Sequence, residues 1–95
     1  MSELELFVVK RIKKLIPDVT KIDFRASVSE KTFSIEFFAT INNMKHQCYD
    51  MVDEGLLDSK ELRQCQIDIA DYIRKSDSFT LGKINKFRFS AENIE

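Results

Sequence analysis

Two neighbouring segments alternate apolar and polar residues, and this pattern constrains the fold more than any other feature of the chain. In residues 20–28 (TKIDFRASV) and 32–41 (TFSIEFFATI) every second residue is apolar. Because successive side chains of a strand point to opposite faces of a sheet, the pattern predicts two strands with one buried face each. Phe38 breaks the alternation and is expected on the polar face, either exposed or covered by another element. The polar residues 29–31 are expected to form the turn between the two strands.

A hairpin and a third strand are expected to follow. The pair Asn42 and Asn43 tolerates the positive φ angles of a tight type I′ turn. Residues 44–49 (MKHQCY) are then predicted to return beside the second strand. Residues 83–90 (KINKFRFS) are a last predicted strand with its two phenylalanines facing the core. The sequence leaves open whether this strand pairs with the first or the third.

A helix is predicted at the start of the chain. In residues 3–16 (ELELFVVKRIKKLI) apolar residues recur at steps of three and four, the period of an amphipathic helix. Ser2 is a suitable N-cap with Glu5 as its capping-box partner, and Pro17 ends the helix. The basic residues of its last turns complement the helix dipole, although a phosphate-binding patch is an alternative interpretation.

A second long helix is predicted over residues 59–75, with an apolar face and with Asp58 and Glu61 as a capping box. Before it, residues 50–55 (DMVDEG) are expected to make one or two helical turns that end at Gly55. The fold class is therefore α+β in the order α-β-β-β-α-β. An antiparallel sheet of about four strands carries two main helices on its apolar face, and the 95 residues form one domain, 1–95.

Composition argues against several classes of protein. The net charge of −1 is unlike that of a general nucleic-acid binder, so we expect no direct nucleic-acid contact. No apolar run approaches the roughly 20 residues of a membrane span, and no signal peptide is visible, which favours the cytoplasm. One histidine and two cysteines have no recognised zinc-ligand spacing, so neither a metal nor a cofactor is expected. A single disulfide between Cys48 and Cys65 stays open, but two buried thiols are favoured.

Residues with catalytic potential are few. We therefore expect that the chain is not an enzyme and has no catalytic residues. The chain lacks the usual nucleophile, phosphate-loop, dinucleotide and zinc-protease motifs. His46 and Cys48 are two residues apart on a predicted strand and would share a face, which suggests a thiolate–imidazole pair as a minor alternative. Glu54 and Asp58 are candidates for acid–base chemistry, although paired surface carboxylates are common.

An acidic run lies in the middle of the chain. Between Lys45 and Lys60 there is no Lys or Arg. The run is either an ordinary solvated surface or a recognition face for a basic partner, in which exposed apolar residues lie among carboxylates. The candidate binding residues are Tyr49, Asp50, Met51, Asp53, Glu54, Leu56 and Asp58, of which Tyr49, Met51 and Leu56 are expected to be the exposed apolar ones.

Five short blocks carry a family resemblance. They are LIP (15–17), SIEFFATI (34–41), QCYDMVDEG (47–55), IADYIRKS (69–76) and KFRFS (86–90). In these blocks and in the order of its elements, most of the chain resembles the YezG-like immunity proteins of bacterial polymorphic toxin and contact-dependent growth inhibition systems. The blocks mark structural positions and include no catalytic motif.

The resemblance implies a cytoplasmic bacterial antitoxin that binds one cognate toxin domain. That domain is often a nuclease with a basic cleft, and the immunity protein neutralises it by occupying the active site or blocking substrate access. A monomer and a homodimer are both compatible with this role. Two alternatives remain: a small non-catalytic adaptor or regulatory domain that binds another protein, and an enzyme that uses Cys48 and His46.

Overall fold

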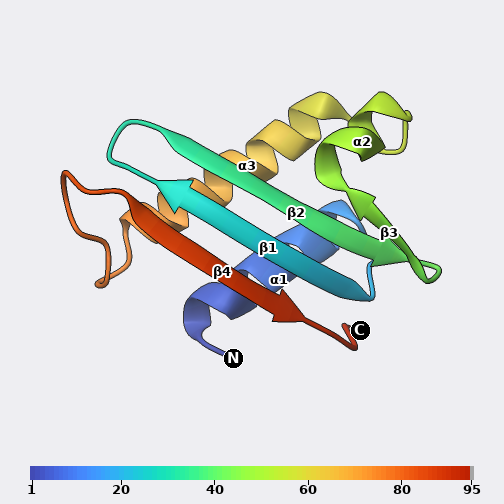
Figure 1. Cartoon of the computed structure of the whole chain (residues 1–95), viewed down its shortest axis with the longest axis horizontal. Helices are drawn as coiled ribbons and strands as arrows, with labels where there is room; N and C mark the ends of the chain where they lie inside the picture. Colours follow the sequence, from blue (N-terminus) through green and yellow to red (C-terminus); the bar gives the residue numbers. More distant parts are fainter. Residues whose placement is uncertain (95) are drawn as a thin grey trace.

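Residues 1–94 fold into three helices and one four-stranded antiparallel sheet (Figure 1). The computed structural model describes residues 1–94. In chain order the elements are α1 (Glu3–Leu15), β1 (Lys21–Val28), β2 (Phe33–Ile41), β3 (Met44–Gln47), α2 (Cys48–Asp53), α3 (Ser59–Arg74) and β4 (Asn85–Ala91). This order, α-β-β-β-α-α-β, confirms the predicted α+β class, with the short helical segment before α3 present as α2.

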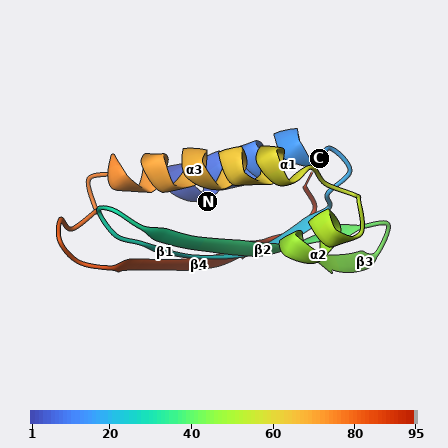
Figure 2. The same ribbon diagram turned by 90° about the horizontal axis from the view of Figure 1, so that it is seen from above.

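The elements form two layers, with both long helices on one side of the sheet (Figure 2). Helices α1 and α3 contact each other over one face, and within residues 1–94 no helix covers the other face (Figure 2). The short helix α2 lies at the end of the sheet beside β3 (Figure 1). This arrangement follows from the alternating sequences of β1 and β2, because the buried residues of each strand lie on one face, and Phe38 is the exception to the apolar alternation.

The strand order is β3-β2-β1-β4, so the last strand pairs with the first. Each neighbouring pair is antiparallel, and the register places Phe24 of β1 between Phe37 of β2 and Phe89 of β4. These three rings lie on the helix-covered face and form part of the core. The sequence left open whether the last strand pairs with the first or the third. It pairs with β1 because the apolar residues of β4 and β2 then align with those of β1 on the same face of the sheet.

Turn and cap positions agree closely with the sequence predictions. Asn42 and Asn43 have φ angles of 50° and 64°, as a type I′ hairpin requires. Ser2 forms the predicted capping box with Glu5. The carboxylate of Asp58 accepts the backbone N–H groups of Lys60 and Glu61 and caps α3, but within residues 1–94 the Glu61 side chain does not return the bond that the predicted capping box requires.

Two predicted strand boundaries are wrong. The third strand ends at Gln47 and does not continue to residue 49, because the Gln47 side chain accepts the N–H groups of Tyr49 and Asp50 and caps the start of α2. The last strand begins at Asn85, two residues later than predicted. The side-chain amide of Asn85 accepts a hydrogen bond from the Thr80 N–H and donates one to the Thr80 carbonyl. These two bonds hold residues 80–84 in a loop.

The two long helices are joined by an ion pair and an aromatic stack. Arg11 Nε donates to Asp68 Oδ2 at 2.9 Å, and the rings of Phe7 and Tyr72 stack with centroids 4.1 Å apart. A hydrogen bond from Gln64 and the nearby Arg11 lower the pKa of Asp68, against the opposing effect of burial. Among residues 1–94, no helix is long and apolar enough to cross a membrane.

The consecutive residues Phe37 and Phe38 offer a matched stability test. Phe37 is fully buried under the helices, whereas Phe38 lies on the open face with 40% of its surface exposed. We expect Phe37→Ala to lower the free energy of unfolding by about 3–5 kcal/mol, because it leaves a cavity in the core. Phe38→Ala is expected to cost about 1 kcal/mol or less. Urea unfolding measures both; equal losses would contradict the assigned faces.

Candidate functional site

The acidic run forms one corner of the molecule, at the connection between α2 and α3 (Figure 1). We call Asp50, Asp53, Glu54 and Asp58 the acidic corner; all four side chains are exposed. Within residues 1–94 none of them takes part in an ion pair. Their exposure agrees with both interpretations of the acidic run, the solvated surface and the recognition face.

Buried anchors and caps fix the backbone of the acidic corner. Met51 and Leu57 point into the core on either side of the turn. Gly55 has a φ angle of 76°, a left-handed conformation that ends α2 and that residues with a Cβ rarely adopt. The carboxylates are therefore presented by an ordered scaffold, which reduces the entropy lost when a partner binds.

The expectation that Met51 is exposed is wrong, since its side chain is only 2% exposed. The reason is the early start of α2. Because the helix begins at Cys48, residues 48 and 51 are one turn apart and face the core together. Tyr49 and Leu56 are exposed, as predicted, and they are the apolar residues that the acidic corner presents.

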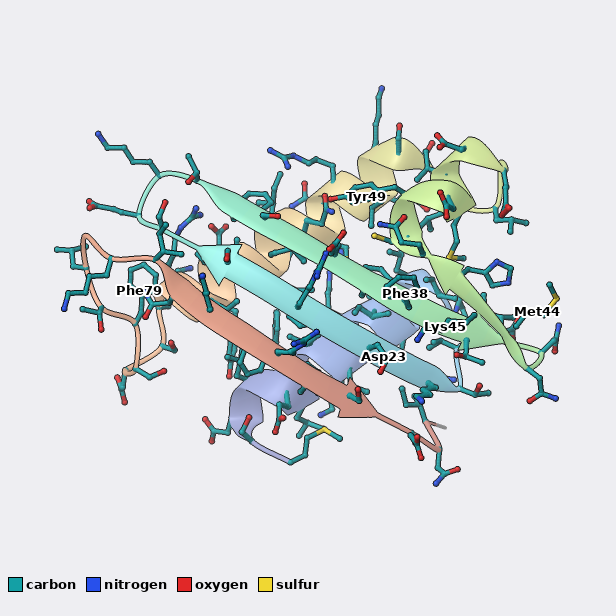
Figure 3. All side chains as sticks on the ribbon, viewed as in Figure 1. Asp23, Phe38, Met44, Lys45, Tyr49 and Phe79 are labelled. Atoms are coloured by element: carbon teal, nitrogen blue, oxygen red, sulfur yellow. The ribbon has the colours of Figure 1, made fainter. Side chains whose placement is uncertain are left out.

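Tyr49 is held in place by a small polar network under the corner. Its hydroxyl donates to the Ile35 carbonyl at 3.0 Å, and Gln66 Nε2 donates to that carbonyl and to the hydroxyl, both at 2.9 Å. Gln66 is the one buried polar residue within residues 1–94. Its role was not predicted from the sequence, although a glutamine beside the apolar positions of α3 was a readable signal. The network orients the Tyr49 ring at the surface (Figure 3).

An apolar groove borders the acidic corner at the same end of the molecule. Its volume is about 370 Å³, and it lies between the end of α1, the β2–β3 turn and the α2–α3 connection. We define it by Leu15, Pro17, Ile41, Met44 and Leu56, with Asp18 and His46 also on its wall. Met44 and Leu56 are 63% and 58% exposed. Sequence reasoning missed the groove because its walls come from segments that are far apart in the chain.

The open face of the sheet differs from the acidic corner because its carboxylates are paired. Lys45 Nζ lies 3.2 Å from an Asp23 oxygen and 4.9 Å from the centroid of the Phe38 ring (Figure 3). Arg25 pairs with Glu36. A hydrogen bond from Ser90, followed by the nearby Lys45, lowers the pKa of Asp23. Because its carboxylates are paired while Arg88 has no ion-pair partner within residues 1–94, this face attracts a basic partner less than the corner does.

The two cysteines are free thiols buried in the core. Burial raises the pKa of the Cys48 thiol, and it raises that of Cys65 to about 11. The prediction that His46 and Cys48 share a strand face is wrong, because Cys48 belongs to α2 while His46 lies on β3 at the groove. Within residues 1–94 no group of three or more His, Cys, Asp or Glu side chains is placed to hold a metal ion.

Comparison of the chain with models of known protein families, with curated proteins and with solved structures finds no match.

The burial of both thiols predicts resistance to alkylation. A buried thiol with a raised pKa is rarely present as the reactive thiolate. We expect native protein at pH 8 to take up no iodoacetamide at Cys48 or Cys65, and the denatured protein to take up two equivalents, as read by mass spectrometry. Rapid modification of either thiol in protein with unchanged circular dichroism contradicts the placement of these residues.

Proposed function

We propose that this chain is an immunity protein that binds a cognate bacterial toxin domain and neutralises it. The resemblance to YezG-like immunity proteins supports the role, the toxin class and a cytoplasmic location. The partner is a basic domain, most simply a nuclease, and the chain acts by binding it without catalysis of its own.

The observation that carries the proposal is the set of four exposed carboxylates without ion-pair partners in residues 1–94, next to an apolar groove. The active site of a nuclease is positively charged because it holds phosphates. Uncompensated carboxylates attract such a surface over several ångströms and accelerate the encounter. Once docked, they occupy the cationic sites that the phosphates of the substrate require, which is the mechanism of inhibition that we propose.

Affinity after the encounter needs buried apolar contacts, because exposed ion pairs contribute little. Tyr49 and Leu56 are placed for this purpose among the carboxylates, and the hydroxyl of Tyr49 is already bonded to Ile35 and Gln66. The ring therefore presents its apolar surface in a fixed orientation. This combination of a rigid aromatic with a charged rim is typical of protein–protein interfaces.

The proposal is tested by capture and inhibition. Tagged protein is isolated from its native cell, co-purifying proteins are identified by mass spectrometry, and the captured partner is assayed for nuclease activity with increasing amounts of the chain. Stoichiometric inhibition of a basic nuclease domain supports the proposal. Stoichiometric recovery of a partner without toxic activity supports an adaptor role and contradicts it.

The acidic corner predicts an effect on association rate that depends on salt. We expect the combined change Asp50→Lys, Asp53→Lys and Glu54→Lys to slow association with the captured partner roughly tenfold or more at low ionic strength. The difference should shrink as salt is added, because salt screens exposed charges. Surface plasmon resonance at several salt concentrations measures the rates.

The matched control is Glu30→Lys, which reverses an exposed charge in the turn at the other end of the sheet (Figure 1). This variant should leave the association rate nearly unchanged. An acidic-corner variant that associates as fast as the wild type at low salt removes these carboxylates from the mechanism.

A further inference from the structure

The loop between α3 and β4 exposes large apolar side chains. Leu81 and Ile84 are 73% and 66% exposed, among the most exposed large hydrophobic residues of the molecule. The loop is nevertheless held in place: the Phe79 N–H donates to the Ser76 carbonyl, and Asn85 bonds to Thr80. Covering these two aliphatic side chains with another apolar surface would remove them from water and is therefore favourable.

Basic residues surround this loop. Lys75, Lys83 and Lys86 are exposed, and Asp77 is the one carboxylate residue among residues 75–86. The loop thus combines an apolar tip with a positive rim. We call residues 76–84 the α3–β4 loop.

The complementary surface is on the same chain, at the opposite end. The apolar groove contains the exposed side chains of Met44 and Leu56, and Asp18 lies on its wall. The acidic corner adjoins the groove, because Met51, Leu56 and Leu57 line it and lie between the corner residues along the chain. Phe79 in the loop and Met44 at the groove lie at opposite ends of the longest axis, along which the molecule extends 39 Å (Figure 3). The loop is anchored at both ends by α3 and β4, so it does not reach its own groove.

We propose that a second copy of this chain occupies the apolar groove, with the α3–β4 loop of one copy docked against the groove of the next. Leu81 and Ile84 then cover Met44 and Leu56, and the lysines of the loop face the carboxylates of the acidic corner. A second copy is favoured as the occupant because it supplies a matching apolar surface and the opposite charge together.

This contact is heterologous, since it joins two different surfaces. Each copy in a pair still has one loop or one groove free, so further copies can add until a ring closes. The same groove borders the acidic corner, and a bound second copy therefore competes with any basic partner for that end of the molecule. The self-association itself does not depend on the identity of that partner.

A complementation experiment tests the proposal. Leu81→Asp removes the loop half of the contact, and Leu56→Asp removes the groove half; both positions are exposed, so folding should be retained. Sedimentation velocity of the wild type from micromolar to millimolar concentration should show species larger than the monomer. Each variant alone should associate roughly tenfold more weakly or not at all. A mixture should form a one-to-one pair that does not grow, because only one functional loop and one functional groove remain.

Further variants guard against an effect on folding. Leu6→Asp places the same charge at another exposed apolar position, on α1, and should associate like the wild type. Lys83→Glu with Lys86→Glu should weaken association, and Asp53→Lys with Glu54→Lys in the other copy should restore it. A monomeric wild type at every concentration, or Leu81→Asp and Leu56→Asp variants that each associate alone as strongly as the wild type, overturns the proposal. Sedimentation of a monomeric wild type, but not of Leu81→Asp, with phosphatidylserine vesicles would assign the loop to a membrane instead.

Discussion

Burial of one face of the sheet under α1 and α3 is the interaction on which the rest of this structure depends. The apolar rows of β1 and β2 cannot remain in water, and the two amphipathic helices are the only long apolar surfaces in residues 1–94 that can cover them. Phe24, Phe37 and Phe89 lie side by side in this layer and fix the register of three strands. The core therefore fixes the positions of the acidic corner, the apolar groove and the open sheet face.

The acidic corner is a consequence of unequal strand lengths. Strand β2 has nine residues and β3 has four, so β3 leaves one end of β2 without a strand neighbour. The short helix α2 lies at this end in place of a longer β3. The side chains of Tyr49 and Gln66 donate hydrogen bonds to the Ile35 carbonyl, which a longer β3 would otherwise have bound. Since α2 buries Cys48 and Met51, its carboxylates have to face the solvent. The same geometry that completes the sheet edge thus creates the proposed binding surface.

Local sequence signals predicted the elements well, because period and capping depend on neighbouring residues. The paired asparagines, the Ser2 capping box and the alternation of β1 and β2 were all readable. The start of α2 was not, because "MKHQCY" fits a strand until the Gln47 side chain is seen to cap a helix. The unpredicted start of α2 at Cys48 explains why Met51 was expected to be exposed although it is buried. The apolar groove and the Tyr49–Gln66 network depend on contacts between distant segments, and no local pattern encodes them.

We propose that a basic partner binds at the acidic corner and leaves the open sheet face free. Amide hydrogen exchange of the chain, measured with and without its captured partner, shows which of these two surfaces the partner covers. We expect slower exchange over residues 48–58 and near Met44 at the groove, with little change in β1 and β4. Protection confined to the strands of the open face, with the corner unchanged, would contradict it.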